Sequence, residues 1–162
     1  MSAERTTGAD TGRARTHHDR HALDQTGAVP SGEQVRRFYD EIWNRQRLDL
    51  VPSVLHPEVT FRGSLGPTRT GHQGFIDYVV EVHDALGDYR CAIDDLVEAG
   101  EQVAVRATFS GRHRGVLLGH APTMRMVSWA GAAFFRFDGE LARDIWVLGD
   151  VDGLRAQLAP PG

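Results

Sequence analysis

The sequence predicts an α+β domain in which about three helices cover one face of a curved antiparallel sheet of four to six strands. Two observations predict this class. In the first half of the 162-residue chain, apolar residues recur at the spacing of a helix, and in the second half they alternate with polar residues as in strands. A sheet that curves around helices leaves a hollow, which is the usual place for a ligand.

The first helix is predicted from an apolar stripe that follows Ser31. Gln34 comes three residues after Ser31, which is the spacing of a capping box at a helix start. The stripe consists of Val35, Phe38, Tyr39, Ile42 and Trp43. A second, short helical segment is expected over residues 48–55, because Pro52 is tolerated near a helix start and His56-Pro57 ends the segment.

The later elements are predicted from changes in hydrophobic spacing. A short strand is expected at residues 59–61, followed by a helix over 71–86. Beyond it the pattern alternates, and the expected strands cover residues 89–97, 103–110, 124–137 and 141–148. Asp138-Gly139 is a strong hairpin signal between the last two strands. A final short helix is expected over residues 151–158.

The first 32 residues differ in composition from the rest. Only Met1, Leu23 and Val29 are large and apolar there, so we expect residues 1–32 to be a disordered tail and residues 33–160 to form the domain. The tail contains His17, His18 and His21, but an unstructured segment supplies no fixed ligand geometry. We therefore expect no metal site.

Composition excludes several classes of function. The formal charge is −4 and no basic cluster is present, which argues against binding to nucleic acid. A single cysteine can form neither an internal disulfide nor a thiolate zinc cage, and no apolar run is long enough for a membrane span. We expect a soluble, cytoplasmic protein that does not bind a membrane. The sequence has no phosphate-binding glycine loop, zincin motif or serine elbow, so we expect no cofactor.

Two stretches of the sequence resemble one known family. VRRFYDEIWNRQRLDLVPSVLHPEVTFRG resembles the start of the nuclear-transport-factor-2-like superfamily. The second half contains, in order, the G-R-H-x-G, x-P-T-x-R, D-G-x-hydrophobic and D-x-x-G-x-x-x-Q-L elements of its SnoaL-like polyketide cyclase branch. The resemblance covers roughly residues 33–158. It implies a cone-shaped α+β fold with a pocket for an aromatic, polyketide-like small molecule.

The resemblance also implies cofactor-free acid–base chemistry, in which an aspartate of the last strand and a histidine of the preceding strand close a ring by an aldol step. Aligned through His113, Gly115 and Asp150, these two positions fall on Val147 and Ala133. Neither residue can move a proton, so a changed chemistry is expected. The alternatives are cyclisation by another route, a cofactor-free hydroxylase, epoxide hydrolase or dehydratase, or a non-catalytic binding module.

Asp144 is the first candidate for a catalytic base. In the last strand, Ile145 and Val147 share one face, and this face lines the pocket if the register follows the family. A bulge after the hairpin would instead turn Asp144 and Trp146 inward, where burial would raise the pKa of the carboxyl. Alternatively, Asp144 pairs with an arginine at a subunit contact.

Two further residues could take part in proton transfer. Asp150 lies between the last strand and the last helix, where a carboxylate most often caps the helix. His113 lies at a strand end near the expected pocket mouth, and its side chain could exchange a proton near neutral pH. A surface histidine between two arginines is the alternative for His113.

The remaining candidates are substrate-binding residues. On one face of the strand over 124–137, Gly131 and Ala133 could open space beside Trp129 for a flat ligand, or could let another element pack closely. Arg62 could hold an anionic or phenolate oxygen at the rim, or could be a solvated edge charge. The other candidates are Tyr39, Trp43, Phe61, Trp146 and Val147, and for Tyr39 and Trp43 core packing is the alternative.

The opposite face of the same strand predicts a partner. It carries Ala130, Ala132 and Phe134, and a soluble sheet does not leave such a face in water. We therefore expect a homodimer that forms through the outer face of the sheet.

Overall fold

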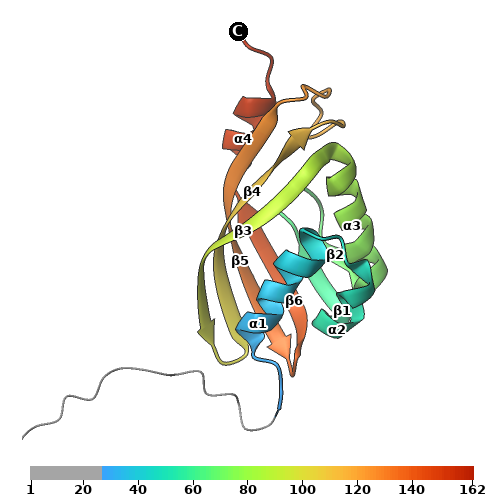
Figure 1. The fold of residues 1–162 in the computed structure, drawn as a ribbon, viewed down its shortest axis with the longest axis vertical. Helices are drawn as coiled ribbons and strands as arrows, with labels where there is room; N and C mark the ends of the chain where they lie inside the picture. Colours follow the sequence, from blue (N-terminus) through green and yellow to red (C-terminus); the bar gives the residue numbers. More distant parts are fainter. Residues whose placement is uncertain (1–26) are drawn as a thin grey trace, which may run out of the picture.

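The computed structural model describes residues 27–162, so residues 1–26 of the predicted tail, including its three histidines, lie outside the described residues. The predicted α+β fold is confirmed. Helices α1 (Ser31–Arg37) and α3 (Gly71–Ala85) lie across one face of a curved sheet (Figure 1). Helix α1 begins two residues before the predicted start of the domain.

Six strands form one sheet in the order β2-β1-β6-β5-β4-β3. Their bounds are β1 Leu55–Arg62, β2 Arg69–Thr70, β3 Leu86–Ala99, β4 Gln102–His113, β5 Met126–Asp138 and β6 Leu141–Gly149. Strands β3 to β6 form the predicted antiparallel meander. Strand β1 is parallel to β6, so the sheet is mixed and not wholly antiparallel as predicted. The reason is the connection through α3, which carries the chain from β1 to β3 at the opposite edge of the sheet. The antiparallel meander then runs back across the sheet, so that its last strand, β6, lies beside β1 and parallel to it.

The helical layer begins as one continuous segment. Helix α1 runs into a π-helical turn, η1 (Phe38–Trp43), and the 3-10 turn η2 (Leu48–Leu50) leads into α2 (Val51–Val54). The predicted apolar stripe of this layer is at most 3% exposed and packs against the inner face of the sheet. Helix α4 (Val151–Leu158) follows β6. Within residues 27–162, none of the helices has the length and apolarity needed to cross a bilayer.

The capping box predicted for the first helix does not form. Pro30 precedes the helix without a side-chain cap, and Gln34 is buried. The Gln34 amide donates hydrogen bonds to the carbonyl oxygens of Ser53 at 3.0 Å and Glu140 at 2.7 Å. Gln34 therefore joins the helical layer to the β5–β6 hairpin, because a buried amide needs partners more than an exposed helix start does.

The helical segment predicted over residues 48–55 is shorter than expected, because β1 begins at Leu55. Pro57 then lies inside a strand. Pairing of β1 with β6 is interrupted between Leu55 and Thr60. Pro57 falls in this gap, where its missing N–H breaks no ladder hydrogen bond.

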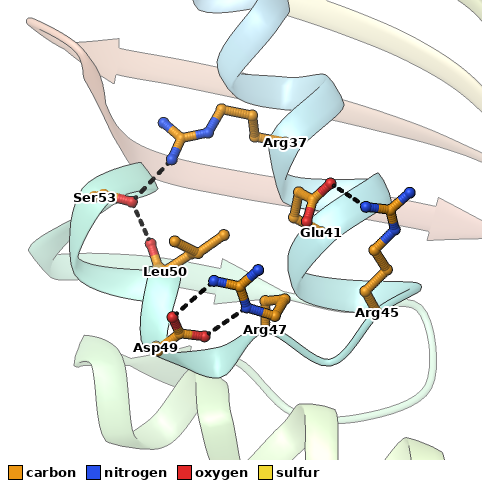
Figure 2. A network of polar contacts seen from close by, with 7 residues as sticks. All are labelled: Arg37, Glu41, Arg45, Arg47, Asp49, Leu50 and Ser53. Carbon is orange, nitrogen blue, oxygen red and sulfur yellow. Dashed lines mark hydrogen bonds and ion pairs between the residues drawn. The ribbon is translucent and has the colours of Figure 1, made fainter.

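Charged side chains of the helical layer lie on its solvent side. Arg45 donates to Glu41 at 3.1 Å, and Arg47 donates two hydrogen bonds to Asp49 at 3.0 and 3.1 Å. Figure 2 shows how these pairs lie. Ser53 donates to the carbonyl oxygen of Leu50 at 2.7 Å. This separation leaves the buried side of the same turns to apolar and aromatic residues.

Two side-chain amides pair with the backbone of strand residues that have a neighbouring strand on one side only. Asn44 donates to the carbonyl oxygen of Cys91 at 2.8 Å and accepts from the Cys91 N–H at 2.7 Å. Gln157 of α4 donates to the carbonyl oxygen of Ser128 at 2.7 Å and accepts from its N–H at 3.0 Å. Each amide thus pairs with both the N–H and the carbonyl oxygen of its strand residue, as a neighbouring strand would.

Candidate functional site

A small hollow, here called the inner pocket, lies between the helical layer and the sheet. It is lined by Phe38, Tyr39, Trp43, Phe61, Gly63, Ser64, Leu65, Tyr78, Tyr89, Cys91, Phe109 and Val147. Its volume is about 20 Å³, which is room for one water molecule. Among residues 27–162, those that line it include neither a carboxylate nor an imidazole. The wall is therefore aromatic and uncharged at neutral pH.

The π-helical turn η1 shapes one wall of the inner pocket. The N–H of Asn44 donates to the carbonyl oxygen of Tyr39 at 2.9 Å, a spacing of five residues. The side chains of this turn that lie on the buried side are Phe38, Tyr39, Ile42 and Trp43. Turns of this kind are rare and frequent at functional sites.

The polar groups of the inner pocket are held protonated by burial. Burial raises the pKa of Tyr39 and of Tyr89 well above the ordinary value of a phenol. It also raises the pKa of Tyr78 to about 12 and the pKa of the Cys91 thiol to about 12. These groups can donate hydrogen bonds at neutral pH, but they cannot act as general bases there.

Tyr39 has no hydrogen-bond partner for its buried hydroxyl within residues 27–162, and the same is true of the indole N–H of Trp129. The hydroxyl of Tyr78, in contrast, accepts from the N–H of Leu65 at 3.1 Å. Arg69 Nε and His113 Nε2 are also buried without a partner within residues 27–162, and of these four atoms only the Tyr39 hydroxyl belongs to a residue that lines the inner pocket.

Val147 and Ala133 lie opposite each other on β6 and β5. Both face inward and are buried, and Val147 lines the inner pocket. The two positions that the family resemblance assigned to an acid–base pair are therefore adjacent in space. Neither carries an ionisable group.

A larger hollow, here called the outer depression, adjoins the inner pocket. It has a volume of about 310 Å³ and is lined by Arg62, Ser64, Val147, Leu148, Gly149, Asp150, Val151 and Asp152. Ser64 and Val147 line both hollows. The outer depression thus contains the charged residues Arg62, Asp150 and Asp152, whereas the aromatic wall belongs to the inner pocket on the other side of Ser64.

Three of the candidate residues line this outer depression: Arg62, Val147 and Asp150. The Arg62 guanidinium donates to the carbonyl oxygen of Val147 at 3.0 Å and lies 5.0 Å from the ring centre of Trp146. The Asp150 carboxylate accepts from the N–H of Gly153 at 2.9 Å, which confirms that it caps α4. A catalytic role for Asp150 stays a prediction.

The family is decided by comparison with known proteins. The model of the SnoaL-like polyketide cyclase family matches residues 33–158. The chain belongs to this family. No curated protein matches the sequence.

Solved structures share the fold of this chain. TsrD from Streptomyces laurentii is 27% identical with a TM-score of 0.70, over 78% of this chain and 92% of TsrD. A SnoaL-like polyketide cyclase from Agrobacterium tumefaciens is 20% identical with a TM-score of 0.68, and the match covers 81% of this chain and 100% of the cyclase. A protein with a ketosteroid isomerase-like fold from Catenulispora acidiphila is 17% identical with a TM-score of 0.68, over 81% and 95% of the chains.

In this SnoaL-like protein, Asp144 does not face the pocket. A bulge does occur in β6, but Arg143 is the extra residue, so Ala142 and Ile145 both point inward and Asp144 points outward. The carboxylate of Asp144 is exposed and accepts a hydrogen bond from Thr60. Trp146 lies on the same outer face, against Phe134 with ring centres 6.0 Å apart. The inward placement considered for Asp144 and Trp146 is therefore wrong.

The space expected over Gly131 and Ala133 is filled. A Cβ on Gly131 would clash with the ring of Phe109 and would lie 2.9 Å from the carbonyl oxygen of Leu148. Ala133 is fully buried in the core, and Trp129 packs on Phe109 with ring centres 5.5 Å apart. The small residues thus let Phe109 pack closely, so the ligand-space interpretation of Gly131 and Ala133 is wrong.

His113 lies neither on the surface nor at a pocket mouth. It is fully buried, and its Nδ1 accepts from the N–H of Thr123 at 3.2 Å. It does not line the inner pocket or the outer depression. One interpretation from the sequence placed His113 near the pocket mouth and the other placed it on the surface between two arginines, whereas the inward alternation of β4 buries it.

Four of the candidate substrate-binding residues, Tyr39, Trp43, Phe61 and Val147, line the inner pocket, and their role in binding substrate stays a prediction. Sequence reasoning missed the other lining residues, which are Phe38, Gly63, Ser64, Leu65, Tyr78, Tyr89, Cys91 and Phe109. Inward alternation marks Phe109, and the same signal was available for Tyr89 and Cys91 in β3. The loop after β1 carries no such signal.

Proposed function

We propose that this SnoaL-like protein is a cofactor-free enzyme of natural-product biosynthesis that cyclises or tailors a small aromatic, polyketide-like molecule. The observation that carries the proposal is the inner pocket. Its aromatic wall suits a flat apolar molecule, and its phenols stay protonated and can donate hydrogen bonds. Family membership supports the same substrate class.

The pocket would act mainly by shape and hydrogen bonding. A chain held in a bent conformation brings its own reacting carbons together, and this positioning lowers the entropic part of the barrier. A donated hydrogen bond stabilises negative charge that develops on a carbonyl oxygen. Val147 and Ala133 supply no base, so the proton must leave to water or to another part of the substrate.

The inner pocket has to widen before it can take such a molecule. Ser64 separates it from the outer depression, and the loop is held by the hydrogen bond from Leu65 to Tyr78. Displacing residues 63–65 would join the two hollows. The proposed substrate route therefore runs from the outer depression, past Ser64, to the aromatic wall.

A second candidate function is a non-catalytic small-molecule binding protein. The specific observation that favours it is the lack of an ionisable side chain at Val147 and Ala133. A cofactor-free hydroxylase, epoxide hydrolase or dehydratase is a third possibility. It would depend on Asp150, because Asp144 points away from both hollows.

Mass spectrometry of the purified protein with a panel of linear and partly cyclised polyketide intermediates tests the proposal. An isobaric or dehydrated product supports cyclisation, and a gain of oxygen or water supports the hydroxylase or hydrolase class. Tight binding without turnover supports the binding protein. Failure of every intermediate to bind contradicts the proposed function as a whole.

We also propose that the protein is a homodimer that associates through the outer face of the sheet. Phe134, Trp146 and Leu148 are exposed there, and the register aligns Val97, Ala104, Phe134 and Trp146 across four strands. An apolar row that crosses a sheet is unusual on a monomer surface and fits a second copy of the same row.

Sedimentation velocity tests the dimer. Phe134→Glu should give a monomer, because a charge in the middle of the row would be buried without a partner. Val80→Glu is the control, since Val80 is equally apolar and exposed but lies on α3. A monomeric native protein contradicts the proposal.

A further inference from the structure

The loop that follows β1 forms a thin wall between the two hollows. Gly63, Ser64 and Leu65 line the inner pocket, and Ser64 also lines the outer depression. Within residues 27–162, a single hydrogen bond joins residues 63–66 to the rest of the protein: the N–H of Leu65 donates to the Tyr78 hydroxyl at 3.1 Å. The polar contacts of this loop therefore depend on one phenol.

Glycines let the loop wrap closely around the ring of Tyr78. A Cβ on Gly63 would collide with the Tyr78 hydroxyl, and a Cβ on Gly66 would lie 3.1 Å from the ring carbon Cε2. Ser64, between these two glycines, rests on Gly149 of β6, where a Cβ would lie 2.9 Å from the Cβ of Ser64. Larger side chains at these positions would push the loop away from both surfaces.

Tyr78 is held in place independently of the loop. It lies on α3 and is 5% exposed. Its ring centre lies 5.0 Å from that of Phe61 and 6.0 Å from that of Trp43. The guanidinium of Arg69 lies 5.9 Å from the same ring centre and pairs with Glu81 of α3 at 2.8 Å. The hydroxyl is therefore the fixed partner of the hydrogen bond, and the loop is the part that can move.

We infer that Tyr78 is a positioning residue that holds residues 63–66 closed as a lid between the outer depression and the inner pocket. With the lid closed, the inner pocket has a volume of only about 20 Å³. One neutral hydrogen bond contributes little net free energy, so the lid opens without unfolding of the sheet. The inference deepens the proposed function, because it names the residue that controls entry to the same pocket.

Cys91 reports on the opening of the lid. It is the one cysteine of the chain, it is 2% exposed, and it lines the inner pocket. N-ethylmaleimide is too large for the closed pocket, so the thiol reacts only after the lid opens. Intact-mass spectrometry follows the single adduct over time in the folded protein. The labelling rate then measures how often the lid is open, and no polyketide is needed.

Two variants release the lid from opposite sides. Tyr78→Phe should raise the labelling rate about tenfold, because it removes one hydrogen bond and keeps the ring. Gly63→Ala should also raise the rate, because its Cβ displaces the loop while the Tyr78 hydroxyl stays. Ser64→Ala is the matched control in the loop and should keep the native rate, since the Ser64 hydroxyl makes no hydrogen bond within residues 27–162.

A variant in α4 separates lid opening from unfolding. Leu158 is 1% exposed and lines neither hollow. Leu158→Ala should therefore lower the melting temperature more than Tyr78→Phe does, because it leaves a cavity in the core, but it should not raise the labelling rate. Thermal melts of all four variants give the stabilities for this comparison.

Three results overturn the inference. A native labelling rate in both Tyr78→Phe and Gly63→Ala would mean that Tyr78 does not hold the loop. Faster labelling in Leu158→Ala than in Tyr78→Phe would mean that unfolding, and not the lid, exposes Cys91. No labelling in any folded variant would mean that the lid does not open. The proposed function is tested separately, by the binding of polyketide intermediates, so either one can fail while the other stands.

Discussion

The two faces of strand β6 differ in what they could do chemically. Val147, on the inner face, is 6% exposed and lies against aromatic rings, whereas Trp146 and Leu148, on the outer face, are 39% and 53% exposed. Asp144 and Arg143 are also exposed. The same strand therefore presents only apolar side chains to the pocket and keeps its charges outside.

This difference teaches that the fold of the family does not by itself fix the chemistry of the pocket. Ala133 and Val147, the positions that the resemblance assigned to an acid–base pair, lie side by side, and neither side chain can ionise. The polar groups that line the inner pocket are neutral hydroxyls and a thiol. Four sets of substitutions test how strict this division between the faces is.

The largest effect is expected from a carboxylate on the inner face. Val147→Asp should lower the free energy of unfolding by about 3 kcal/mol at pH 7.5, because it buries a charge without a partner. Burial would raise the folded-state pKa of this carboxyl above its unfolded value. The loss should therefore grow as the pH rises from about 4, the unfolded pKa, and should be smaller below it.

Urea denaturation at pH 4 and at pH 7.5 measures this loss. Leu148→Asp is the matched control on the outer face, one residue away. It should cost little at either pH, since Leu148 is exposed. Similar losses in both variants would show that the two faces are not distinct.

The next effect concerns packing on the inner face. Gly131→Ala should destabilise the protein by about 2 kcal/mol, because its Cβ would meet the ring of Phe109 and the carbonyl oxygen of Leu148. Ala130→Ser, at the exposed neighbouring position, should change stability by less than about 0.5 kcal/mol. Thermal melts compare the two, and a neutral Gly131→Ala would mean that space exists beside Phe109 after all.

A smaller effect is expected at the edge between the faces. Asp150→Ala should cost about 1 kcal/mol through loss of the α4 cap. Asp150→Asn should keep the stability, since asparagine caps equally well, and should also keep the turnover. Chemical denaturation and product formation are measured for both variants. Turnover lost in Asp150→Asn with stability intact would make Asp150 a base.

The smallest effect is expected on the outer face. Asp144→Asn should change the free energy of unfolding by less than about 0.5 kcal/mol and leave ligand binding unchanged, because the side chain is exposed and asparagine can still accept from Thr60. Urea denaturation measures the stability, and titration calorimetry with a polyketide intermediate that binds the native protein measures the binding. A loss of binding would place Asp144 in contact with the pocket.

The helices, the meander and the buried stripe could be predicted because burial imposes a period on the sequence. The cap at Asp150 was predicted from its position between the last strand and the last helix. Periodicity could not decide the orientation of Asp144, since a bulge at Arg143 shifts the alternation by one residue and leaves no mark in composition.

The inner pocket was harder to predict than the fold. Tyr39 and Trp43 were found because they lie on a periodic stripe, but Ser64 and Leu65 belong to a loop whose path is set by Tyr78. Space over Gly131 could not be judged from the sequence, because Phe109 comes from a different strand. Cavities depend on which side chains meet across strands, and that information is not local.

The two amides that seal exposed strand edges create a chemical weakness. Hydrolysis of Asn44 or Gln157 to the acid changes one atom and barely alters shape, yet it replaces a donor with an oxygen that repels the carbonyl of Cys91 or Ser128. An edge that had been satisfied would then be open to pairing with another chain. Loss of the Asn44 amide would therefore also disturb the wall of the inner pocket, because Cys91 lines it, whereas Gln157 lines neither hollow.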